Sequence, residues 1–311
     1  MKRRINSVSF YISHLSINCA LHELGRADFD DPRLTRRLLE IARDFFARPQ
    51  ALIAQASQSR SRRKAAYRFF ENDVTTMDKI LHPHYESTIR RCSEHAVVLA
   101  AQDTTSLNYT GLKACEGLGG IGDDTHIKSI GLLVHDTMAF TPSGTPLGLL
   151  DVQCWSRDKD KTKQKKNRNR PIEEKESFKW LKSFRRVAEV QNACPSTMMV
   201  SVGDREADLY DLFFEADKSQ DMPKLLVRAT QNRRSIDQEG SIWTNLKKKE
   251  SCTEVKLIIP RKGKTPSRTA HVEIRFDHIT LRPPYRGKHP PVALTAIIYG
   301  CQPGRFSWSQ M

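Results

Sequence analysis

Hydrophobic residues recur at helical spacing through the first part of the chain. Asp31 followed by Pro32 is typical of a helix start, because aspartate caps helices and proline favours the first helical position. One apolar stripe then follows, made of Leu34, Leu38, Ile41, Ala42 and Phe45. Pro49 ends this helix, and further helical segments are predicted at 51–56 and 76–92.

The middle of the chain changes to short apolar runs that are typical of strands. The order of the predicted elements is three strands, a helix, a strand, a second helix and a last strand. The predicted strands lie at 96–102, 127–136, 147–155, 198–203 and 225–228. The first of the two helices follows Pro171, and the second begins after Gly203 and Asp204. An α/β core with a mixed sheet is therefore expected here.

The last part of the chain reads as an antiparallel β module. Its predicted strands, at 254–260, 270–281 and 291–299, are joined by basic or proline-rich loops. The chain is predicted to contain, in order, an irregular N-terminus (1–23), a helical domain (24–95), the α/β core (96–230), an inserted β-rich module (231–300) and an irregular tail (301–311).

The net charge of the chain gives the clearest indication of its binding partner. Lys and Arg number 51 against 36 Asp and Glu, which gives a formal net charge of +15. A polyanion such as nucleic acid is the expected partner, the alternative being a merely basic soluble protein. The seven cysteines are spread singly, which favours reduced thiols in the cytoplasm. No run approaches the roughly 20 apolar residues of a membrane span, so no membrane partner is expected.

A basic segment within the helical domain is the candidate nucleic-acid interface. Arg60, Arg62, Arg63, Lys64 and Arg68 follow a serine-rich turn and surround a small apolar set. A short basic helix of this kind can enter a DNA groove, where arginines meet phosphates or guanine edges. The alternative is a solvated basic face. A second charge run, at 161–170, could clamp a DNA backbone or be a solvated loop.

Two aspartates are the candidate catalytic residues. Asp204 follows the strand at 198–203, and Asp103 follows the strand at 96–102 beside Thr104 and Thr105. Open α/β sheets place their chemistry at such carboxyl ends of strands, although a single aspartate there is equally typical of a turn or helix cap. Two carboxylates on neighbouring strands would repel unless a cation lay between them, and hard oxygen ligands select Mg²⁺ or Mn²⁺.

The chain resembles the DDE cut-and-paste transposases of bacterial insertion sequences, in the branch marked by a D-R-E-A-D motif. That motif is Asp204 to Asp208 here, and the first-aspartate motif is similar to Asp103 to Leu107. Further similar stretches lie at 31–33, 66–69 and 174–180, so the resemblance covers most of the chain between residues 24 and 299.

The resemblance implies a ribonuclease H-like core and a transposase that binds transposon-end DNA as a homodimer. It implies that Asp103 and Asp204 are two of three carboxylates that hold divalent metal for strand cleavage and transfer. It also implies that Arg37 and Arg68 touch the end DNA, and we add the neighbouring Arg36 to this candidate set.

The chain departs from the family pattern after Asp204. The third carboxylate, a glutamate in a Tyr, Arg, Glu, Lys pattern, is not found, and neither are the dimerisation helices. We therefore expect a C-terminally truncated chain with an incomplete core that is inactive alone and does not support the family homodimer. The alternatives are a non-catalytic DNA-binding remnant, an inhibitor of an intact transposase, and a ribonuclease H-like nuclease without end preference.

Overall fold

The computed structural model describes residues 19–112, 115–122, 129–157, 170–284 and 289–301. It has a mixed α/β architecture that divides into two compact units. The first unit contains the N-terminal helices and most of the sheet, and the second contains residues 169–181 and everything from Gly203 onward. Among the described residues, the helices are too short or too polar to cross a bilayer.

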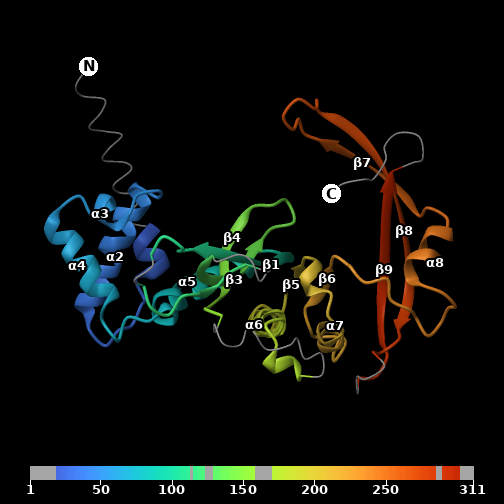
Figure 1. Ribbon diagram of the computed structural model, residues 1–311, viewed down its shortest axis with the longest axis horizontal. Helices are drawn as coiled ribbons and strands as arrows, with labels where there is room; N and C mark the ends of the chain where they lie inside the picture. Colours follow the sequence, from blue (N-terminus) through green and yellow to red (C-terminus); the bar gives the residue numbers. More distant parts are fainter. Residues whose placement is uncertain (1–18, 113–114, 123–128, 158–169, 285–288, 302–311) are drawn as a thin grey trace. The chain divides into compact units, whose positions relative to one another are not determined.

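The N-terminal part of the first unit is helical, as predicted. Its helices are α2 (Pro32–Ala47), α3 (Ile53–Ala56), α4 (Arg60–Phe70) and α5 (Met77–Cys92), drawn in blue to cyan in Figure 1. Asp31 caps α2 by accepting the Arg33 N–H, as the aspartate–proline pair predicts. Residues 19–24 are also helical, although 1–23 was expected to be irregular, because Ala20 is buried there and Glu23 pairs with Arg91.

One apolar cluster holds these helices together. Its buried members are Ala27, Phe29, Leu38, Ile41, Ala66 and Phe69. Phe69 of α4 meets Phe29 edge to face, with ring centroids 5.6 Å apart. The cluster fixes which side of α4 faces inward, and therefore which side carries its charges outward.

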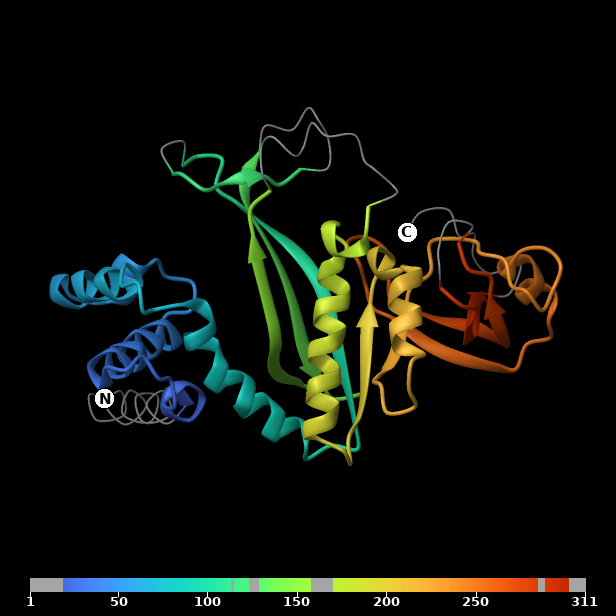
Figure 2. The same cartoon turned by 90° about the horizontal axis from the view of Figure 1, so that it is seen from below.

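The sheet of the first unit is mixed. β1 (Val97–Asn108) pairs antiparallel with β3 (Ile130–Phe140), which pairs antiparallel with β4 (Pro146–Trp155) and, at its start, with β2 (Gly119–Gly120). β1 also pairs in parallel with β5 (Met198–Gly203), from Val97 opposite Met198 to Ala101 opposite Val202. Figure 2 shows α6 (Phe178–Ala193) running along this sheet.

The core of the first unit lies on one face of that sheet. Val98 and Ala100 of β1 are fully buried there and pack with Val187 and Val190 of α6. Their neighbours Val97, Leu99 and Ala101 point to the other face and are only partly buried. The alternation of burial along β1 therefore tells which of its side chains face α6.

Two strand boundaries differ from the prediction. β1 continues past residue 102 to Asn108, and β3 runs to Phe140 instead of ending at Asp136. The two strands support each other, since the antiparallel ladder between them extends from Leu99–Phe140 to Asn108–Gly131. Asp103 therefore lies inside a long strand, and the expectation that it ends a strand was wrong.

The second unit begins at the end of β5. It contains the short 3₁₀ helix η3 (Arg205–Ala207), α7 (Tyr210–Ala216) and β6 (Lys224–Val227), whose end is tied back by Arg228 N–H to the Gly203 carbonyl at 3.1 Å. The helix expected directly after Asp204 is thus split into η3 and α7.

The three antiparallel strands predicted for the last part of the chain are confirmed in the second unit. β7 (Thr253–Ile259), β8 (Arg268–Leu281) and β9 (Val292–Cys301) form a sheet in the order β7-β8-β9. An unpredicted helix, α8 (Ile242–Lys248), lies against this sheet (Figure 1). Ile242 and Leu246, four residues apart, pack with Tyr210 and the buried ends of β8 and β9.

Candidate nucleic-acid interface and carboxylate site

The basic helix α4 is stabilised by a capping serine and by two side chains that face the interior of the protein. The Ser59 hydroxyl accepts the Arg62 N–H at 3.2 Å and so caps the first turn. Ala66 and Phe69 are about three residues apart and nearly fully buried, which turns one side of α4 toward α2. The remaining positions of this arginine-rich helix are left to solvent.

The structure divides the predicted DNA-binding residues into two groups. Arg62 forms an ion pair with the buried Asp44 of α2 at 2.8 Å, and Arg37 pairs with Glu40 at 2.5 Å. The others form no ion pair with any residue in the described part of the chain, and all are exposed: Arg36, Arg60, Arg63, Lys64 and Arg68. Arg62 therefore anchors α4, whereas the second group offers uncompensated charge.

Two aromatic residues on α4 are exposed, although the sequence analysis placed Phe70 in the apolar set of this segment and gave Tyr67 no separate role. Tyr67 and Phe70 are 45% and 46% exposed, although residues of this size are usually covered. Tyr67 follows Arg63 by four residues and Lys64 by three, so it shares their side of the helix. Exposed aromatic rings among basic side chains suit contact with sugars or thymine methyl groups. The signal was present in the sequence as aromatics between the arginines.

The cap of α4 gives a first prediction. Ser59→Ala should lower the free energy of unfolding by about 1 kcal/mol, because the first-turn N–H groups would lose their acceptor. Thermal unfolding followed by circular dichroism measures the change. Ser59→Asn is the matched control, since an asparagine at this position can also accept the Arg62 N–H. Equal unfolding temperatures for both variants would contradict the role of Ser59.

Asp204 lies where the strand β5 meets the turn, as predicted. Its Oδ1 atom accepts the Glu206 N–H at 2.8 Å, so the carboxylate caps η3. Gly203 is required before it, since a Cβ there would lie 2.4 Å from the Ala207 side chain and 3.2 Å from the Trp180 ring. The Glu206 carboxylate in turn pairs with the buried Lys179 ammonium at 3.0 Å.

Asp103 faces a second carboxylate that the sequence analysis did not single out. Asp136 of β3 is its direct partner across the antiparallel ladder. Burial raises the pKa of the Asp136 carboxyl, and the nearby Asp103 carboxylate raises it further. The sequence showed Asp136 only as the expected end of a strand, and its position opposite Asp103 depends on the register.

The two predicted catalytic aspartates belong to different units. Within the first unit, the parallel pairing of β1 and β5 reaches Ala101 opposite Val202, and each aspartate follows two residues later in its own chain segment. Within the first unit, the carboxylate oxygens of Asp103 and Asp136 are of the kind that suits a hard divalent cation. No group of three or more acidic, histidine or cysteine side chains that could hold a metal occurs among the described residues.

Asp208, the last residue of the D-R-E-A-D stretch, has a structural role. It is 3% exposed and accepts N–H groups of Thr230 and Gln231, both at 2.8 Å, and the guanidinium of Arg233 at 2.6 Å. Burial alone would raise the pKa of the Asp208 carboxyl, but these hydrogen bonds outweigh it and hold the pKa below its ordinary value. Asp208 thus ties α7 to the loop that enters the β module.

Comparison with known proteins gives a family match over the helical segment that contains the basic residues. Residues 18–75 match the family described as transposase DNA-binding, and this range contains α2, α3 and α4. A solved piggyBac transposase synaptic complex with hairpin DNA is similar at 13% sequence identity and a TM-score of 0.30. The match covers 92% of this chain and 50% of that chain. The family match therefore shows that residues 18–75 are similar to a transposase DNA-binding domain.

Proposed function

We propose that this protein is a DNA transposase of an insertion sequence and that it binds transposon-end DNA through α4. One observation supports the proposal. The segment that matches a transposase DNA-binding domain contains α4, and the exposed side of α4 carries Arg60, Arg63, Lys64 and Arg68. When basic side chains neutralise phosphates of a duplex, counterions are released and binding is favoured. The formal net charge of +15 is consistent with this kind of binding.

We further propose that Asp103 and Asp204 are the metal-holding carboxylates of a ribonuclease H-like core. The support is the order β4-β3-β1-β5, in which the strand carrying Asp103 pairs in parallel with the strand that leads to Asp204. When bound, Mg²⁺ or Mn²⁺ would stabilise charge on the attacked phosphate and lower the pKa of a coordinated water. The side chains of this chain would hold and orient that ion.

In this proposal the chain alone binds DNA without cutting it. Among the described residues, no group of three or more acidic, histidine or cysteine side chains is placed so that it could hold a metal. A displacement of about 1 Å at a reacting centre can cost on the order of a hundredfold in rate, so an incomplete ligand set would cost more. Such a chain would occupy DNA ends or pair with an intact copy and repress it.

One gel experiment tests both parts of the proposal. Labelled duplexes from the two flanks of the coding sequence, and scrambled duplexes, are incubated with the full chain and Mn²⁺. We expect a shifted complex that prefers the flanking duplex and shows no nicked strand. Nicking that disappears in Asp204→Ala would overturn the inactivity and support the catalytic role. Equal binding and cutting of both duplexes would instead support a nuclease without end preference.

A further inference from the structure

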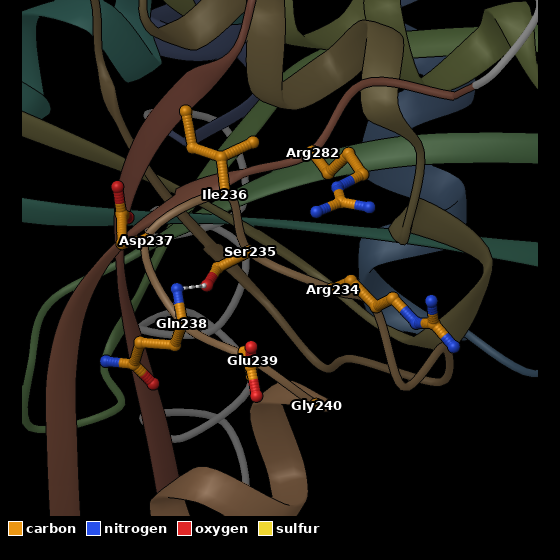
Figure 3. A pocket seen from close by; sticks show the side chains of 8 residues that line it. All are labelled: Arg234, Ser235, Ile236, Asp237, Gln238, Glu239, Gly240 and Arg282. Carbon is orange, nitrogen blue, oxygen red and sulfur yellow. Dashed lines mark hydrogen bonds between the residues drawn. The ribbon is translucent and has the colours of Figure 1, made fainter.

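A loop of the second unit forms a pocket that the function above does not use. The pocket has a volume of about 470 Å³ and is lined by the loop from Arg234 to Gly240 together with Arg282 (Figure 3). Backbone hydrogen bonds hold the loop against the end of β8, from Arg282 N–H to the Arg234 carbonyl at 3.0 Å and from Ile236 N–H to the Thr280 carbonyl at 2.9 Å. The two arginines are therefore neighbours across a fixed backbone bridge.

The guanidinium groups of Arg234 and Arg282 are exposed and form no ion pair with the residues that the structure describes. The preceding residue, Arg233, behaves differently, because it is bound to Asp208 and lies over the Phe213 ring with 5.6 Å to the centroid. The adjacent residues Arg233 and Arg234 therefore have different roles. Arg233 holds the loop to Asp208, whereas Arg234 is exposed among the residues that line the pocket.

The acidic side chains that line the pocket form no ion pair with these two arginines in the described part of the chain. The Asp237 carboxylate accepts the Thr280 N–H at 2.5 Å, and Figure 3 shows it on the opposite side of the loop from both guanidiniums. Glu239 is exposed, and only its backbone carbonyl is bound, by the Asn245 side chain at 2.9 Å; its carboxylate forms no ion pair with the described residues. Arg234 and Arg282 therefore present two exposed guanidinium groups on the side of the loop away from Asp237 (Figure 3).

We propose that Arg234 and Arg282 together bind one phosphodiester group of a DNA backbone. Guanidinium groups carry several N–H donors in a planar fork that matches the oxygens of a phosphate. A phosphodiester has one negative charge and two free oxygens, so each arginine can take one oxygen. The site reads no bases and gives the β module its own contact with DNA, which rests on the proposed DNA-binding function.

The salt dependence of binding measures this contact directly. The full chain is titrated onto a scrambled duplex of about 30 base pairs by fluorescence anisotropy at several salt concentrations. Arg234→Gln/Arg282→Gln is compared with Lys247→Gln/Lys248→Gln, which removes the same charge from exposed residues of α8 in the same unit. Loss of one phosphate contact should make the slope of log affinity against log salt less negative by about 0.9 in the arginine variant.

Comparing the arginine variant with the lysine variant distinguishes a specific phosphate site from an effect of net charge on DNA binding. We expect the lysine variant to keep the wild-type slope, and Glu239→Gln to tighten binding, because a carboxylate next to the phosphate is removed. Equal slopes for wild type, arginine variant and lysine variant would overturn the phosphate site. Equal losses in the arginine and lysine variants would also overturn it, since net charge alone would then explain them.

A third comparison separates this inference from the proposed function. Arg60→Gln/Arg63→Gln removes two charges from α4, and the thermal unfolding of each variant is checked first. If DNA affinity falls in the α4 variant but not in the Arg234→Gln/Arg282→Gln variant, the proposed function is supported and the phosphate site in the pocket is refuted. Wild type that does not bind duplex DNA at any salt concentration would refute both.

Discussion

Arg60→Gln/Arg63→Gln should weaken binding to end DNA by about thirtyfold or more. Both side chains are exposed on α4 without an ion pair to the described residues. An arginine that contacts a base edge or phosphate contributes about 1–3 kcal/mol, so two such residues contribute at least about 2 kcal/mol. Anisotropy with the flanking duplex at fixed salt gives the two dissociation constants.

The contrast with Arg62 makes this prediction specific. Arg62 lies between Arg60 and Arg63 in sequence, yet it pairs with the buried Asp44. Arg62→Gln should therefore lower the unfolding temperature while changing DNA affinity less than either neighbour. A larger loss of affinity in Arg62→Gln than in the double variant, with the fold intact, would show that the solvent-facing side of α4 is not the DNA-binding side.

Asp208→Ala should lower the free energy of unfolding of the second unit by about 3–5 kcal/mol. The carboxylate is buried and receives the Arg233 guanidinium and the N–H groups of Thr230 and Gln231. Its removal leaves a cation and two backbone donors without their acceptor in a part-buried site, and breaking such a pair is costly. Chemical denaturation followed by Trp fluorescence reports the loss.

The pH dependence gives an internal check on Asp208. A carboxyl whose pKa is lowered in the folded state contributes stability above its unfolded pKa of about 3.9, and that stability is lost as the pH falls through the lower folded value. The wild type and Asp208→Ala should therefore differ most near neutral pH and converge in acid. Asp211→Ala is the control, since Asp211 is partly exposed nearby and, among the residues that the structure describes, forms an ion pair with His289 alone. A difference that stays constant with pH would rule out the ionised carboxylate as the cause.

The sequence by itself determined the local elements of this protein. The apolar stripe of α2, the basic α4, the strand before Asp204 and the three strands of the β module were all predicted close to their observed limits. Periodicity encodes which side of an element is buried, and capping residues such as Asp31 encode where it begins. The net charge of +15 also pointed to a polyanion before any fold was known.

Tertiary structure alone decided which of these residues meet. Asp136 lies opposite Asp103 only because β1 continues along β3, and a long strand of this kind is stabilised by its partner and not by its own sequence. Arg62 and Arg233 look like their neighbours in sequence, but buried carboxylates 18 and 25 residues away make them structural. Pairings over such separations depend on register and burial, which the local pattern of hydrophobic and polar residues does not specify.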